Sequence, residues 1–147
     1  MITCSLIGLT VAATVPNLRS YRESQRVWRA SEQVAAACRE ARARARSENH
    51  NVFIEYRTDE NALAIVNDVN NNGVADSGEQ VQVRPLAEGM SLQSTTFPND
   101  RLLFDSRGRA VAGGSVRLGG AEGVQPKSVR VAAGTGQVRV RSCSDGS

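Results

Sequence analysis

The chain has 147 residues and a formal net charge of +3, which leaves room for one compact domain and one extended element. Aromatic residues make up only 4% of the sequence, so a core must be built mainly from valine, leucine and alanine. All but one of the 18 basic residues are arginines, which favours bidentate contacts with carboxylate or phosphate. A single histidine, His50, and a single lysine leave few general bases near neutral pH. The composition therefore argues against an enzyme.

The first fifty residues predict one long helix. Residues 2–15 carry no charge, and residues 17–47 are helix formers without glycine or proline. Apolar or small residues recur every three to four positions, which predicts one buried stripe: Val27, Ala30, Val34, Ala37, Cys38, Ala41 and Ala45. About 45 residues would form a rod of roughly 65–70 Å. A domain this small cannot bury such a rod, so we expect its apolar first third to be buried in a membrane or against other copies.

After Asn49 the apolar period changes from helical to alternating, which predicts strands. The predicted strands cover residues 52–57, 63–66, 80–84, 101–105, 115–118, 128–132 and 137–141, with glycine-rich turns between several of them. A helix followed by antiparallel strands is the α+β order. We therefore expect an N-terminal helix over residues 1–49, with residues 1–16 apolar, and a β-sheet domain over residues 50–147.

Four stretches carry a resemblance to a known family. Val15-Pro16-Asn17-Leu18-Arg19-Ser20-Tyr21 resembles the N-terminal helix of type IV pilins and type II secretion pseudopilins. Residues 41–48, 104–110 and 136–140 are similar, in the same order, to the GspH/FimT/FimU-type minor pilins. The resemblance implies a pilin-like fold, with a long N-terminal helix packed on a C-terminal antiparallel β-sheet domain.

The same resemblance implies a structural subunit of a type IV pilus or type II secretion pseudopilus, placed near the tip. Its partners would be other pilins or pseudopilins, contacted through the helix. It would lie in the inner membrane with a periplasmic domain before assembly, and in the pilus or pseudopilus at the cell surface afterwards.

The start of the chain departs from the family pattern. The family has a short basic leader, a Gly-Phe cleavage junction and a glutamate just inside the mature N-terminus, whereas this chain starts with Met1 inside the apolar run. A spanning helix needs about 20 apolar residues, and residues 2–15 are fewer. We expect a mis-assigned start codon or a clipped sequence rather than a soluble variant.

The last two predicted strands alternate valine with basic residues. A two-residue turn at Gly134 and Thr135 would place Val131 opposite Val138 and Arg130 opposite Arg139. The basic side chains would then form a compact patch suited to phosphates. The candidate DNA-binding residues are Lys127, Arg130, Arg139 and Arg141.

DNA binding at this patch is what the resemblance to FimT-type pilins implies, since these are DNA receptors in natural transformation with a Gly-Arg-x-Arg motif in this region. Here the motif is Gly136-Gln137-Val138-Arg139, so glutamine replaces its first arginine, and Arg141 would have to substitute. The alternatives are a solvated strand face and a contact with an acidic surface of a neighbouring subunit.

Residues 68–79 match the calcium-loop pattern D-x-[DN]-x-[DN]-G-x5-E at every specified position. The predicted oxygen ligands are Asp68, Asn70, Asn72, the Val74 carbonyl, Asp76 and Glu79. The loop follows a strand, so it is not an EF-hand. Asparagine and aspartate also favour tight turns without any metal, so calcium and a metal-free turn are both open.

There are three cysteines, and Cys4 lies in the apolar run. In an extracytoplasmic domain, a disulfide between Cys38 and Cys143 would fasten the C-terminal end of the chain to the helix. The alternative is two unpaired thiols, because a disulfide requires the two Cα atoms to lie within about 7 Å.

Overall fold

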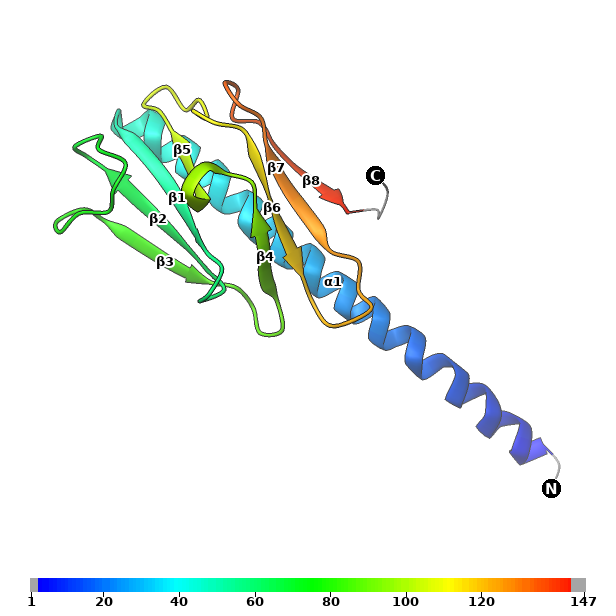
Figure 1. Ribbon diagram of the computed structural model, residues 1–147. Coiled ribbons are helices and arrows are strands. Elements are labelled where there is room, and N and C mark those ends of the chain that lie inside the picture. Colours follow the sequence, from blue (N-terminus) through cyan, green and yellow to red (C-terminus); the bar gives the residue numbers. More distant parts are fainter. Residues whose placement is uncertain (1–2, 144–147) are drawn as a thin grey trace.

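The structure, a computed structural model, describes the backbone of residues 3–143 and the side chains of residues 18–143. A single helix, α1 (Thr3–Glu48), runs behind two four-stranded antiparallel sheets, and its N-terminal part projects beyond them (Figure 1). The helix ends where Asn49 adopts a left-handed conformation with φ of 56°, which asparagine tolerates at helix ends. Among the described residues, no helix is both long and apolar enough to cross a membrane.

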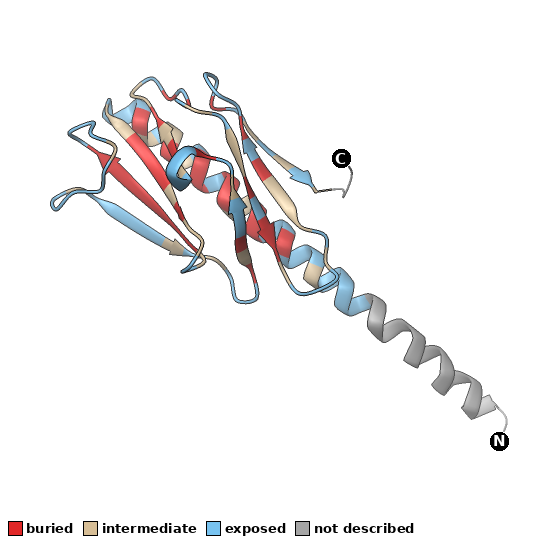
Figure 2. Cartoon of the chain, in the orientation of Figure 1, coloured by how far each residue is buried: buried red, intermediate tan, exposed pale blue. Residues whose placement is uncertain are grey.

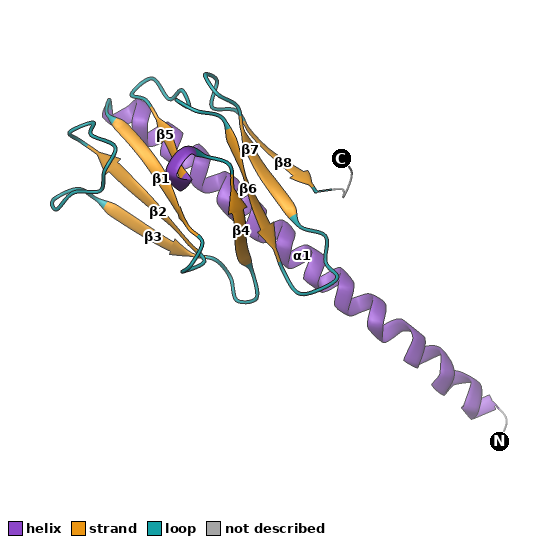
Figure 3. Cartoon of the chain, in the orientation of Figure 1, coloured by secondary structure: helices purple, strands orange, loops and turns teal. Residues whose placement is uncertain are grey.

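The first sheet has the order β3-β2-β1-β5. Its strands are β1 (Asn51–Arg57), β2 (Ala62–Asp68), β3 (Val81–Pro85) and β5 (Arg101–Phe104). The second sheet has the order β4-β6-β7-β8. Its strands are β4 (Ser91–Thr95), β6 (Gly114–Gly119), β7 (Lys127–Val131) and β8 (Val138–Ser142), and the short 3₁₀ helix η1 (Pro98–Asp100) connects β4 to β5. Figure 3 shows the two sheets next to each other in front of the helix.

The core lies between α1 and the inner faces of both sheets (Figure 2). On the helix the buried side chains are mostly small, which lets the backbone approach the strands closely. They meet larger side chains from both sheets, such as Ile54, Leu102, Phe104, Leu118 and Val129, all fully buried. Because the helix contacts strands of each sheet, the two sheets share one core.

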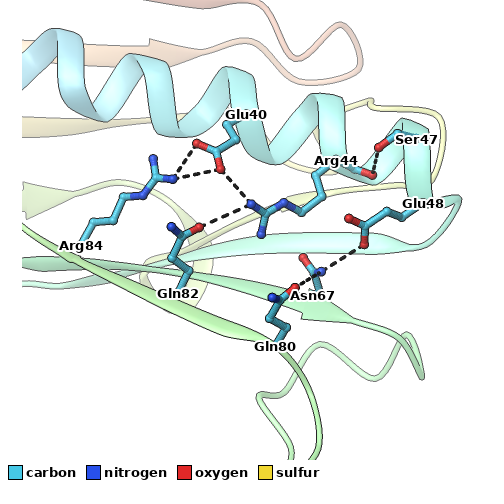
Figure 4. Close-up of polar contacts among 8 residues, drawn as sticks. All are labelled: Glu40, Arg44, Ser47, Glu48, Asn67, Gln80, Gln82 and Arg84. Atoms are coloured by element: carbon cyan, nitrogen blue, oxygen red, sulfur yellow. Dashed lines mark hydrogen bonds and ion pairs between the residues drawn. The ribbon is translucent and has the colours of Figure 1, made fainter.

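Polar side chains close the open side of this core between α1 and the edge strand β3 (Figure 4). The carboxylate of Glu40 lies 2.8 Å from Nη2 of Arg44, one turn later, and 2.8 Å from Nη2 of Arg84 on β3. Nearer the helix end, Nδ2 of Asn67 donates to Glu48 at 3.0 Å and to Gln80 at 3.3 Å. These contacts fix the edge strand to the helix.

The α+β, pilin-like fold predicted from the sequence is confirmed. All seven predicted strands are present, with boundaries shifted by a few residues. The sequence prediction missed β4, which has a single large apolar residue, Leu92, among serine, glutamine and threonine. β4 also contains a register irregularity between Leu92 and Ser94, and such a bulge breaks the strict alternation on which strand prediction depends.

Candidate functional site

The β7–β8 hairpin separates valines from arginines. Val129 and Val131 on β7 are buried, and Val138 and Val140 on β8 pack against the core from its margin. The predicted register is confirmed, since Val131 pairs with Val138 and Arg130 pairs with Arg139. Because successive side chains of a strand point to opposite faces, the arginines lie on the outer face of the second sheet.

The turn that joins these strands differs from the prediction. The last closing pair is Ala132 and Gln137, with a 3.0 Å bond from the Ala132 N–H to the Gln137 carbonyl. The loop therefore holds four residues, 133–136, and not the two residues Gly134 and Thr135. Both Gly134 and Gly136 have positive φ values, of 76° and 64°, which glycine adopts at low cost. The predicted and the observed loops are both centred between Gly134 and Thr135, so the register is unchanged.

A fourth arginine, which was not among the candidates predicted from the sequence, lies on the same outer face. Arg117 on β6 pairs with Ser128 on β7, and Ser128 pairs with Arg141 on β8. We call the set Arg117, Arg130, Arg139 and Arg141 the arginine face. The signal was present in the sequence, because Val116-Arg117-Leu118 alternates as β7 does. β6 and β7 are consecutive strands joined by residues 120–126, so their pairing could have been expected.

The arginine face is strongly basic, and no acidic side chain of the second sheet neutralises it. The four strands of the second sheet contain no aspartate or glutamate. Within the described part of the chain, none of the four guanidinium groups forms an ion pair, and Arg139 donates only to Oε1 of Gln137, at 3.3 Å. Like charges directly opposite each other destabilise a strand pair, as holds for Arg130 and Arg139. An anion bound between them would remove this repulsion.

Two shallow hollows on this surface offer room for such an anion. One, of about 330 Å³, is lined by Arg130, Arg139, Arg141, Ala132 and Gln137. The other, of about 750 Å³, adds the hydroxyl groups of Thr96, Ser115 and Ser128 beside Arg130 and Arg141. Guanidinium and hydroxyl donors together suit phosphate or carboxylate oxygens.

The structure does not place Lys127 with these arginines. Lys127 stands two residues before Val129 and therefore points to the same side as Val129, toward the helix. Its Nζ lies 5.5 Å from the centre of the Trp28 ring and 2.5 Å from the hydroxyl of Ser142. The prediction that Lys127 belongs to the basic patch is therefore corrected: it lies on the opposite face of the sheet.

The predicted calcium loop is closed by its own hydrogen bonds. Both carboxylate oxygens of the buried Asp68 accept backbone N–H groups, from Asn72 at 3.0 Å and from Gly73 at 2.8 Å. Glu79 accepts the N–H groups of Val69 and Asp76, each at 3.1 Å. Gly73 allows the sharp turn of this loop through its positive φ, of 73°.

The remaining polar groups of this loop also bond to each other. The amide groups of Asn70 and Asn72 donate to Asp76 at 2.8 and 2.6 Å, and these bonds lower the pKa of the Asp76 carboxyl. Among the residues whose side chains are described, no three acidic, histidine or cysteine groups gather. The polar groups of the loop already have partners within it, so we expect the turn to keep this shape without a metal.

The predicted disulfide is not formed in the structure, since Cys38 and Cys143 are both free. Cys38 points into the core, where its Sγ lies 3.5 Å from the hydroxyl of Tyr56 on β1. Cys143 instead follows the edge strand β8, and its N–H donates to the Pro126 carbonyl at 3.0 Å. The side chain of Cys4 lies outside the described residues.

Comparisons with known proteins agree with this architecture. The family model "Type II transport protein GspH" matches residues 30–136, whereas no curated protein matches the chain by sequence. One similar solved structure is the minor pseudopilin EpsH from the type 2 secretion system of Vibrio cholerae. It is 13% identical with a TM-score of 0.56, over 80% of this chain and 95% of EpsH.

A second similar structure is the type IV minor pilin FimU of Pseudomonas aeruginosa PAO1. It is 15% identical with a TM-score of 0.62, over 82% of this chain and 92% of FimU. At these identities the likeness shows the shared fold: one long helix packed on antiparallel strands. The family match covers most of the chain, from the buried half of the helix to the β7–β8 turn, and this chain therefore belongs to the GspH family of type II transport proteins.

Proposed function

We propose that this chain is a minor pilin or pseudopilin, a structural subunit of a type IV pilus or type II secretion pseudopilus. The observation that carries the proposal is the division of α1. Its second half supplies one side of the domain core, while its N-terminal part projects beyond both sheets (Figure 1). Membership of the GspH family and the fold shared with EpsH and FimU support the same role.

In this role the uncharged residues 2–15 hold the subunit in the inner membrane before assembly and against other helices in the filament afterwards. The burial of apolar surface supplies the free energy in both states. The exposed Leu18 and Tyr21, 54% and 64% accessible, continue the apolar surface toward the domain. The sheet domain then faces the periplasm or the filament surface.

We place the subunit near the filament tip. Four unpaired guanidinium groups would be costly to bury between subunits, unless an acidic surface met each of them. A terminal position leaves the arginine face in solvent. Immunogold labelling at filament ends would support this position, and labelling along the whole filament would contradict it.

Incorporation into sheared filaments tests the structural role. We expect Leu18→Glu/Tyr21→Glu to be lost from the filament fraction, because two charges then interrupt the helix surface. The matched control is Val69→Glu/Val74→Glu, which changes two exposed valines, 64% and 48% accessible, in the β2–β3 loop. Equal incorporation of both variants would contradict packing through the helix.

DNA binding in natural transformation is the second candidate function, and the arginine face favours it. Four guanidinium groups on adjacent strands, without an acidic neighbour in the second sheet, suit a run of phosphates. The face presents serines and arginines but no aromatic ring in its strands. Contacts would therefore go to the backbone and carry little sequence preference.

Fluorescence anisotropy of labelled duplex DNA against the full chain, as a salt series, tests this candidate. Neutralising four phosphates predicts a slope of log K against log salt of about −3.6. Arg139→Gln/Arg141→Gln should lower the affinity and reduce the slope to about −1.8. Arg19→Gln/Arg22→Gln on the helix is the matched control. No binding at low salt, or equal loss in both variants, would reject the arginine face as a DNA site.

A further inference from the structure

The helix segment from Leu18 to Arg29, which we call the collar, carries two exposed surfaces. One is basic: Arg19, Arg22, Arg26 and Arg29 follow each other at intervals of three, four and three residues. At 3.6 residues per turn these positions fall within an arc of about 80°. All four residues are exposed. Among the described side chains their single ion pair joins Arg26 to Glu23, at 3.2 Å on the helix surface.

The second exposed surface of the collar is apolar and aromatic. Leu18, Tyr21 and Trp28 are 54%, 64% and 45% accessible and fall within another arc of about 80°, centred roughly 100° from the arginines. The third side of the helix faces the domain, where Val27 and Ala30 are buried with Met90. The collar thus has separate basic, aromatic and domain-facing sides.

Lys127 is a fifth cation near the collar, and it lies on the aromatic side rather than the basic side. Its ammonium group lies over the Trp28 ring, beside an open hollow of about 390 Å³ that Trp28, Lys127, Ser24 and Val124 help to line. The connection between β6 and β7 forms the other wall of this hollow. A cation above an exposed indole ring gives this corner of the domain both an apolar and a positively charged surface.

We propose that the collar is a lipid-headgroup site, which binds an anionic phospholipid surface. The four arginines and Lys127 contact headgroup phosphates, and Tyr21 and Trp28 lie at the boundary between headgroups and acyl chains. Aromatic rings favour this boundary because they are apolar with a polar edge. Arginine reaches phosphate while its aliphatic stem stays on apolar surface.

The order of residues along the helix supports lipid over other anions. The uncharged residues 2–15 precede the collar, and the folded domain begins at the C-terminal end of the collar, where Val27 is buried. From Arg19 to Arg29 the helix rises about 15 Å, so the arginines, Tyr21 and Trp28 reach the headgroup layer together when this segment lies along the lipid surface. The apolar arc of the collar and the uncharged run have no counterpart in a nucleic acid duplex.

This inference is separate from the filament role and from the arginine face. It needs the helix to meet the lipid interface and does not need it to cross the membrane. It also does not require filament assembly, so a failed assembly assay would leave it standing. The arginine face belongs to the second sheet and has no exposed aromatic residue in its strands, so it provides the matched control.

The test is co-flotation of the full chain with vesicles of phosphatidylcholine alone and of phosphatidylcholine mixed with phosphatidylglycerol. Each basic residue near an anionic surface contributes about fivefold to partitioning. For the four arginines and Lys127 together we expect a preference of up to about 3,000-fold for the anionic vesicles, falling with salt. Trp28, the single tryptophan, should shift its emission to the blue and become shielded from aqueous quenchers.

Two variants of equal charge assign the effect to residues. Arg19→Gln/Arg22→Gln/Arg26→Gln/Arg29→Gln should lose the preference for anionic vesicles, and the corresponding glutamine variant of the arginine face should keep it. Circular dichroism confirms that both are folded. If the helix variant with four substitutions does not fold, Arg19→Gln/Arg22→Gln replaces it, and the preference for anionic vesicles should then fall about 25-fold.

Three outcomes would overturn the inference. Equal partitioning of the unchanged chain into both kinds of vesicle would remove the headgroup contact. An equal loss of the preference in both charge variants would show that it depends on the net charge of the chain and not on the collar. Loss of duplex DNA binding by the helix variant, with no preference for anionic vesicles in the unchanged chain, would assign the collar arginines to nucleic acid.

Discussion

The pair formed by Cys38 and Tyr56 predicts how the stability of the domain depends on pH. Burial raises the pKa of the Cys38 thiol from its usual 9.0 to about 11. Burial is also the main cause that raises the pKa of the Tyr56 hydroxyl, and the neighbouring Cys38 raises it further. A group whose pKa is raised in the folded state contributes its full stability below its unfolded pKa and loses it as pH rises. For Cys38 this loss runs from about pH 9 to about pH 11.

The magnitude follows from these two values. At about pH 10 the unfolded thiol is mostly ionised while the folded thiol is mostly protonated, so the free energy of unfolding falls by about 1.4 kcal/mol relative to pH 7. Urea unfolding at about pH 7 and pH 10, in reductant, measures this difference. In Cys38→Ala the fall between the two pH values should be smaller by that amount, while Cys143→Ala should behave as the unchanged chain. An equal fall in all three proteins would refute the assignment to Cys38.

Three further substitutions test contacts described above by urea unfolding. Glu40→Gln should lower the free energy of unfolding by about 1 kcal/mol, because the Glu40 carboxylate bridges one arginine on the helix and one on β3. Glu32→Gln is the control and should leave it almost unchanged, because Glu32 forms only a surface ion pair, at 3.8 Å. Asp68→Asn should cost about 1–3 kcal/mol, since its buried oxygens accept two backbone N–H groups, and calcium should not change this loss. Ala41→Leu should cost about 1–3 kcal/mol, because the fully buried Ala41 leaves no room for a larger side chain. A cost near zero for Asp68→Asn or Ala41→Leu would contradict the packing described here.

Much of the fold follows from the sequence because its signals are local. The stripe from Val27 to Ala45 repeats at the helical period, and the helix ends at Glu48, one residue from the predicted end. The register of Arg130 and Arg139 followed from the alternation together with the place of the turn, since the predicted and the observed loops are both centred between Gly134 and Thr135. The exact turn was not predictable, because both Gly134 and Gly136 take positive φ.

The remaining features depend on which strands are neighbours and on where side chains meet in the core. Arg117 joins the arginine face because β6 pairs with β7, and alternation within one strand does not reveal that pairing. Lys127 was assigned by its closeness in sequence to Arg130, although the parity of its position puts it on the opposite face. Cys38 was paired with Cys143 because both are cysteines, whereas the side chain actually meets Tyr56.

The way α1 crosses both sheets has a mechanical consequence. From Val27 to Ala45 the helix lies against the domain core over about 27 Å, with its axis along the direction in which the projecting part would be pulled. A tensile load on that part acts parallel to the contact surface, so many side-chain contacts bear it at once and none is peeled first. Both sheets share that load because each packs on the same helix. Force applied at the N-terminal end would thus reach the whole domain without hinging one sheet against the other.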